Sequence, residues 1–161
     1  MKNILLIIIL LAFVACNNAE KDANAEKQVG FEVEYLEGYF PKNDIQFNAP
    51  VKTLIINKKE DFDKYFGIAQ TMKNQVPTID FDKNKVVAII SAPSDKKQEI
   101  LIPSADLKKN RLVVKYKVMA DKVTQSFTST DLKMFLIPKS VYAIDFIIDS
   151  DEPETSKKEK P

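Results

Sequence analysis

Two short stretches of the chain hold residue types and spacings that could do chemistry. Ser94 and Lys97 have the Ser-x-x-Lys spacing of penicillin-recognising acyl transferases, in which the serine is the nucleophile. Asp80, Asp82 and Asn84 have the oxygen spacing that opens a calcium loop. Both patterns are incomplete, because the serine lies in a polar turn and the calcium pattern lacks its glycine and its bidentate glutamate. We interpret both stretches as solvated turns.

The composition excludes several classes of site. The chain has no His and one Cys, so a Ser-His dyad, a His-ligated metal and an internal disulfide are all excluded. Asp145 is the nearest candidate for a general acid, but the alternation around it predicts that it points outward. The formal net charge is +1, which argues against a nucleic-acid partner. We therefore expect no enzymatic activity, no cofactor and no metal.

The single thiol lies at the end of a targeting signal. Lys2 precedes an unbroken apolar run over residues 4–14, which is shorter than the roughly 20 residues of a membrane-spanning helix. Ala15 and Cys16 follow, and the stretch resembles a bacterial lipobox with Phe13 in place of the usual leucine. The resemblance implies a cysteine acylated after cleavage. The alternative is an ordinary signal peptide with a chance cysteine.

These features predict the organisation of the chain and its location. Residues 1–15 are the lipoprotein signal peptide, and residues 16–28 are the acylated cysteine and a polar tether. Residues 29–148 form a single domain, and residues 149–161 form a charged, disordered tail. Acyl chains on Cys16 would hold the protein on the cell envelope. Asn17, where inner-membrane lipoproteins often have Asp, favours the outer membrane of a Gram-negative bacterium.

The domain alternates short apolar strands with turns and has one early helix. Asn57 and Glu60 have capping-box spacing, and Phe62, Tyr65 and Phe66 recur at helical spacing behind them. Strands are expected over residues 31–35, 51–56, 85–92, 99–102, 112–118, 133–137 and 141–148. Most of these follow one another closely, which predicts an antiparallel meander. The expected fold is α+β: a curled sheet or open barrel of about six or seven strands packed on the early helix.

The order of these pieces resembles the PrcB-like family of protease-complex subunits. The resemblance covers residues 52–148 and includes Asp80-Phe81 before a buried strand, a Ser/Thr-rich stretch over residues 126–130, and Ile137-Pro138 between the closing strands. The family often has a glycine and an aromatic residue in the hairpin after the Asp-Phe strand. Residues 92–99 of this chain contain neither. The resemblance implies a non-catalytic lipoprotein that binds an exported protease and stabilises it.

The partner-binding surface is expected on loops over residues 92–98, 120–125 and 126–131. The residues of these loops that we assign to partner contact are Pro93, Ser94, Asp95, Lys96, Phe127, Thr128 and Ser129. Two other functions remain open. One is a structural or stress-related envelope lipoprotein without a protease partner, and the other is a peptidase inhibitor, although no glycine-containing inhibitory loop is evident.

Overall fold

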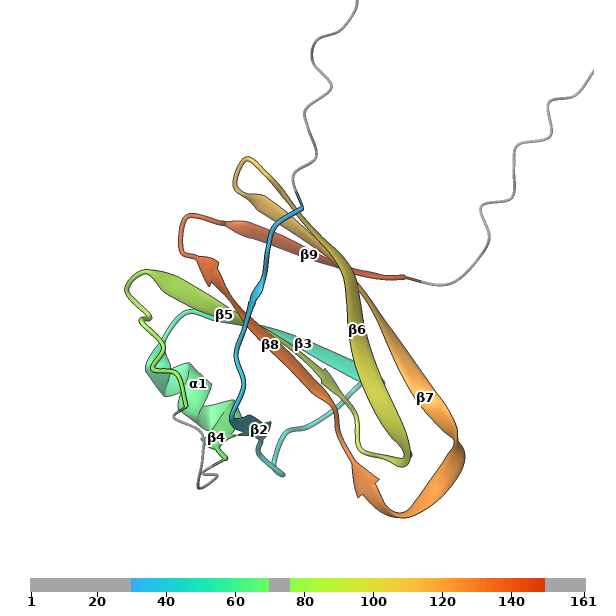
Figure 1. Cartoon of the computed structure of the whole chain (residues 1–161). Helices are drawn as coiled ribbons and strands as arrows, with labels where there is room; N and C mark the ends of the chain where they lie inside the picture. The colour runs from blue at the N-terminus through green and yellow to red at the C-terminus, as the bar shows by residue number, and fades with distance from the viewer. Residues whose placement is uncertain (1–29, 70–75, 150–161) are drawn as a thin grey trace, which may run out of the picture.

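The computed structural model describes residues 30–69 and 76–149. This part is mostly β, with a single helix and nine strands in three separate sheets, none closed into a barrel (Figure 1). The elements in chain order are β1 (Glu34–Tyr35), β2 (Tyr39–Pro41), β3 (Val51–Ile56), α1 (Lys59–Tyr65), β4 (Phe66–Ile68), β5 (Asn84–Ser91), β6 (Ser94–Lys108), β7 (Arg111–Ser129), β8 (Leu132–Pro138) and β9 (Ala143–Ile148). The expected α+β class is confirmed at this coarse level, whereas the expected single curled sheet of six or seven strands is not what the chain forms.

A four-stranded sheet in the order β1-β8-β5-β3 forms the middle layer of the described part. Its central strand β5 is buried along nearly its whole length, because both of its faces are covered. Val87 and Ile89 face the second sheet, of order β6-β7-β9, in one core cluster. Val86 and Ile90 face α1 in another cluster, which includes Phe62. A continuous apolar strand is therefore what this position in the fold requires.

The parallel pair β7 and β9 departs from the expected meander. β9 runs alongside residues 111–116 of β7 in the same direction, and every other strand pair is antiparallel. The chain reaches this position by crossing from β8 in the middle sheet to the second sheet, through the turn at residues 139–142. A parallel neighbour requires such a crossing, and local patterns of alternation do not predict which sheet a strand joins.

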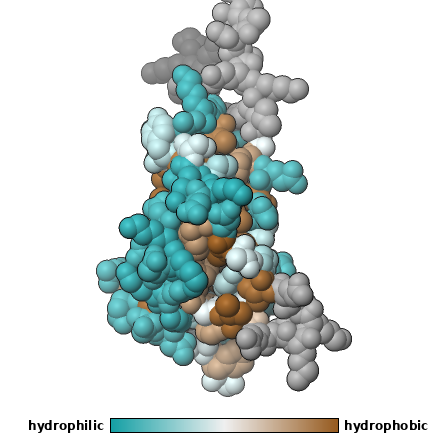
Figure 2. Space-filling view, turned by 90° about the vertical axis from the view of Figure 1, so that its left-hand side faces the viewer, coloured by the Kyte–Doolittle hydropathy of each residue, from teal (hydrophilic) through white to brown (hydrophobic). Residues whose placement is uncertain are grey.

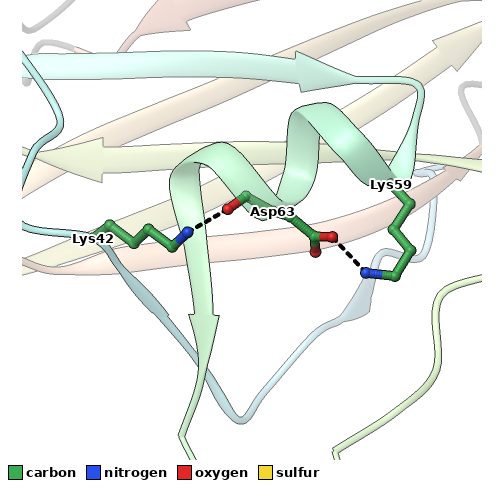
Figure 3. Close-up of polar contacts among 3 residues, drawn as sticks. All are labelled: Lys42, Lys59 and Asp63. Carbon is green, nitrogen blue, oxygen red and sulfur yellow. Dashed lines mark hydrogen bonds and ion pairs between the residues drawn. The ribbon is translucent and has the colours of Figure 1, made fainter.

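The helix α1 is shorter than its aromatic pattern suggests and is capped differently. Its N-cap is Lys58, which makes no side-chain capping bond, so the capping box predicted at Asn57 is wrong. Phe66, predicted to continue the helix, begins β4, which pairs with β2. The Lys42 ammonium, just after β2, donates to the backbone carbonyl oxygen of Asp63, and Lys59 forms an ion pair of 2.5 Å with the Asp63 carboxylate (Figure 3). The Lys42 contact ties the β2–β4 ribbon to the helix, whereas the Lys59–Asp63 pair lies within the helix.

The surface over the helical side of the molecule is mainly hydrophilic, with hydrophobic side chains gathered near its lower end (Figure 2). Phe40 of β2 and Ile68 of β4 are the exposed apolar residues of the small ribbon beside α1. The Phe40 ring lies directly over Gly67, where a Cβ atom would come within 2.5 Å of the ring. A glycine is therefore needed at this position for the ring to pack against the backbone.

Candidate functional site

The hairpin of β6 and β7 is longer than the sheet it covers. Its turn lies at Lys109, which has a positive φ of 55°, and the near half packs on the middle sheet through buried residues such as Ile100 and Leu112. The far half consists of residues 94–99 of β6 and residues 119–129 of β7, and we call it the outer ribbon. In Figure 1 it forms the lower right part of the molecule. Most of its residues are exposed.

The residues predicted for partner contact meet on the outer ribbon. Ser94 lies opposite Ser129, so the two segments that the sequence placed in separate loops are neighbours in space. The prediction that they are loops is wrong, because Ser94, Asp95 and Lys96 belong to β6 and Phe127, Thr128 and Ser129 belong to β7. Pro93 lies in the short connection between β5 and β6. Both faces of the ribbon meet water, so polar side chains do not alternate with apolar ones along it. Hydrophobic alternation therefore does not reveal these strands in the sequence.

The outer ribbon is irregular in register. Between the pairs Lys96–Thr124 and Gln98–Ala120, one residue of β6 lies opposite three of β7, and a further irregularity follows toward Ser94. Extra residues of this kind bend a strand and increase its twist. These irregularities also make the strand edge a poorer template for pairing with a strand of another chain. The ribbon is therefore suited to contact a partner through its side chains rather than through unpaired backbone groups.

A set of polar contacts fixes the ribbon at its root. The backbone N–H of Ile100 donates to Oδ2 of Asp131 at 2.6 Å, and the backbone N–H of Asp131 donates to Oγ of Ser91 at 2.7 Å. The backbone N–H of Ser91 donates in turn to the carbonyl oxygen of Asp131 at 3.0 Å. Ser91 and Ile100 are fully buried. Asp131 thus joins the end of β5 to β6 at the point where the outer ribbon begins.

Three large apolar side chains of the outer ribbon are exposed to solvent. Met119, Val123 and Phe127 of β7 are 54%, 75% and 62% exposed. Phe127 is one of the residues predicted for partner contact and Val123 lies in the predicted surface over residues 120–125, whereas Met119 lies outside the predicted surfaces. The signal was present, because an unbroken strand would place residues four apart on one face. The charged residues around them balance in sign, namely Asp95, Lys96, Lys97, Glu99, Asp121 and Lys122.

Two glutamine side chains of the outer ribbon lack a hydrogen bond to their oxygen, unlike the polar groups at the root of the ribbon. Oε1 of Gln98 and Oε1 of Gln125 are buried and have no hydrogen-bond donor among the described residues. A buried acceptor without a donor costs about 1–3 kcal/mol. The outer ribbon is therefore stabilised less than the core half of the same hairpin, and we expect it to be the more easily deformed half.

The stretches considered for chemistry serve other purposes. Oγ of Ser94 accepts from the backbone N–H of Lys96 at 3.0 Å, and Ser94 and Lys97 lie in the strand β6 rather than in a helix, where their spacing would bring them onto one face. The Asp80 carboxylate accepts from the N–H of Asp82 at 3.0 Å and pairs with Lys83. Both are turn or strand contacts, and within residues 30–69 and 76–149 no three Cys, Asp or Glu side chains come together as a metal site.

Two further charged groups have structural partners. Asp145 pairs with Arg111 across β7 and β9, and this contact raises the pKa of the arginine. The ammonium group of Lys85, a buried residue, donates to the carbonyl oxygen of Val141 in the turn between β8 and β9. Lys85 is not among the candidate residues predicted from the sequence, and it lies at the start of the most apolar strand.

The predicted lipidation site, Cys16, lies outside the described residues, as do the signal peptide, the tether and nearly all of the charged tail. In the described ranges, no helix has the length and hydrophobicity needed to span a membrane. Comparison with protein families, curated proteins and solved structures finds no match to the chain.

Proposed function

We propose that the chain is an exported, lipid-anchored protein of the cell envelope that has no catalytic activity and binds another exported protein through its outer ribbon. The observation that carries the proposal is the exposure of Met119, Val123 and Phe127 on a ribbon that extends past the sheet it covers. Exposed apolar side chains rimmed by polar ones are typical of protein interaction sites. Aromatic residues and methionine are enriched in such interfaces.

The convergence of the predicted contact residues supports the same surface. Ser94 and Ser129 come from segments distant in sequence, and their pairing puts residues 94–96 and 127–129 on one structural unit. The root contacts of Asp131 hold this unit on the middle sheet. An exported protease that the chain stabilises is the partner class implied by the resemblance to the PrcB-like family.

The anchor is proposed from the lipobox-like stretch that ends at Cys16. Acylation of this cysteine would keep the domain at a membrane surface without a spanning helix. Labelled palmitate should be incorporated into the wild-type protein and lost in Cys16→Ala, which should also leave the membrane fraction.

The partner is tested by a pull-down in mild detergent from the native envelope. Phe127→Ser should reduce the recovered partner about tenfold or more, because buried aromatic anchors contribute about 2 kcal/mol or more to binding. Tyr142→Ser is the matched control, since Tyr142 is 78% exposed and lies outside the ribbon. An eluate with no stoichiometric partner would contradict the proposal and favour a structural envelope lipoprotein.

A further inference from the structure

The described chain enters the domain beside the turn of the β6–β7 hairpin. The N–H of Phe31 donates to the carbonyl oxygen of Ala105 at 2.7 Å, and Gly30 bridges to Asp106. Ala105 and Asp106 lie near the end of β6, just before the turn at Lys109. In Figure 1 the chain begins next to this turn at the top of the view, whereas the outer ribbon lies at the lower right. These pairings fix which end of the domain lies nearest to the preceding residues of the chain.

The proposed anchor is a short length of chain away from this end. Residues 17–29 separate Cys16 from Gly30, and a chain of this length spans at most about 50 Å when fully extended. Acyl chains on Cys16 would therefore keep the turn of the hairpin close to the bilayer. Arg111 and Phe127 lie near opposite ends of β7, so Phe127 lies up to about 50 Å from the turn, at about 3.3 Å per residue.

The turn of the hairpin is basic and tight. Lys108 pairs with Arg111, so only Lys109 and Asn110 form the loop between the two strands. A loop of two residues follows the twist of the strands that it joins and holds its side chains at a defined place. Lys108, Lys109 and Arg111 are exposed, and none of the four residues is acidic.

A second turn lies against the first and has the same charge. The N–H groups of Tyr142 and Ala143 donate to the carbonyl oxygen of Asn110, at 3.0 and 3.4 Å. The turn over residues 139–142 is thereby held beside the hairpin turn. It contains the exposed Lys139 and no carboxylate, and Tyr142 is 78% exposed. Tyrosine is typical of the membrane–water interface, because it has an apolar ring and a polar hydroxyl.

Two carboxylates close to these turns are engaged by groups of the protein. Asp145 forms an ion pair with Arg111 across β7 and β9. Oδ2 of Asp106 accepts a hydrogen bond from Oγ of Ser104 at 3.3 Å. These contacts use the charge of the arginine and leave the lysines of the two turns to be considered.

The lysines of the two turns are free among the described residues. The ammonium groups of Lys108, Lys109 and Lys139 have no ion pair or hydrogen bond with any described residue. Glu32 and Asp82 are exposed carboxylates at the same end of the domain, but neither belongs to the two turns. The outermost part of this end therefore presents positive charge to whatever surface it meets.

We infer that the turn of the β6–β7 hairpin, together with the turn over residues 139–142, docks on the anionic headgroups of the membrane that holds the acyl chains. Each lysine close to an anionic bilayer surface favours contact about fivefold. Docking in this way holds the outer ribbon away from the bilayer, where an exported partner can reach it. The inference rests on the proposed function, because it gives the orientation of the anchored domain.

The test uses tryptophan fluorescence in anchored protein. The chain has no Trp, so a single introduced tryptophan reports on one position. Tyr142→Trp at the turn and Phe127→Trp in the outer ribbon are a matched pair, since both replace an exposed aromatic residue. The mature chain is reconstituted in phosphatidylcholine vesicles with or without phosphatidylglycerol, and a lipid with a spin-labelled headgroup is the quencher. Where Cys16 is found unmodified, its thiol is coupled to a maleimide lipid, so that the measurement does not depend on natural acylation.

On vesicles with phosphatidylglycerol, the tryptophan at the turn should be quenched at least about threefold more than the one in the outer ribbon. Lys108→Glu together with Lys109→Glu should remove most of this difference. So should 1 M salt, which shortens the screening length to about 3 Å. Lys96→Glu together with Lys97→Glu is the matched control, because it makes the same change of net charge on the outer ribbon and should leave the difference unchanged.

Two results would overturn the inference. One is equal quenching of the two tryptophans on vesicles with phosphatidylglycerol. The other is quenching at the turn that persists in the variant with Lys108→Glu and Lys109→Glu. Failure of the proposed function is distinguishable, because an unmodified Cys16 in protein from the envelope removes the anchor, and a pull-down without a partner removes the binding function. Neither of these results alters the quenching measured on vesicles.

Discussion

Replacing Asp131 with alanine should loosen the outer ribbon at its root. The Asp131 carboxylate accepts a hydrogen bond of 2.6 Å from the backbone N–H of Ile100, a fully buried residue. Alanine has no acceptor to replace it, and the loss leaves a buried donor without a partner. The backbone contacts between Asp131 and Ser91 do not require the side chain and should persist.

The magnitude follows from the kind of bond that is lost. A hydrogen bond to a charged acceptor contributes about 1.5–3 kcal/mol, and a buried unsatisfied donor costs about 1–3 kcal/mol. We expect Asp131→Ala to lower the free energy of unfolding by about 2 kcal/mol. With a urea m-value of about 2 kcal/mol/M, the midpoint should fall by about 1 M.

The assay is urea unfolding of the full chain followed by far-ultraviolet circular dichroism. Asp131→Asn is the matched control, since it keeps an oxygen acceptor and should lose about 0.5–1 kcal/mol. Hydrogen exchange of the Ile100 amide should accelerate in the alanine variant more than in the asparagine variant. Equal stability of the two variants, or a loss below about 0.5 kcal/mol for alanine, would refute the assignment of Asp131 as the root contact.

Two further predictions concern turns. Gly38→Ala should lower the free energy of unfolding by about 1–2 kcal/mol, because Gly38 has a positive φ and lies against Val76. Gly30→Ala is the control and should change the free energy of unfolding little, because no atom lies within 4 Å of the Cβ position there. Equal urea midpoints for the two variants would contradict this prediction. Hydrogen bonds from Lys83 and from the Asp82 amide lower the pKa of Asp80 below its usual 3.8. The ionised Asp80 carboxylate should therefore stabilise the fold above pH 3.8, and this stabilisation should be lost as the pH falls through the lower pKa of the folded state. Asp80→Asn should remove this part of the acid dependence in a pH series of thermal unfolding, and an unchanged acid limb would count against the turn contacts.

The parts of the fold that sequence predicts are those in which local pattern and burial agree. β5 is a continuous apolar run because both of its faces are covered, and Phe62 is placed on the core side of a helix by its spacing. β2 and β4 are three residues each, too short for a periodic signal, and Phe66 belongs to the helical pattern although it begins a strand. Tertiary pairing decides such short segments.

The candidate site was predicted in part. The polar residues around Ser94 and Ser129 were selected as loops, because strands that meet water on both faces show no alternation. That they form one ribbon depends on a pairing between distant segments, which no local pattern contains. The position of Gly30 beside the turn at Lys109 depends likewise on its bridge to Asp106, and no local pattern predicts it.

The most direct measurement of the proposed interaction is photo-crosslinking in the native cell envelope from a reactive side chain placed at Phe127. We expect one dominant adduct with an exported protein from this position and none from a probe at Tyr142, which is more exposed than Phe127 but lies outside the outer ribbon. No adduct from Phe127, or the same adducts from both positions, would contradict the claim that the outer ribbon binds a partner.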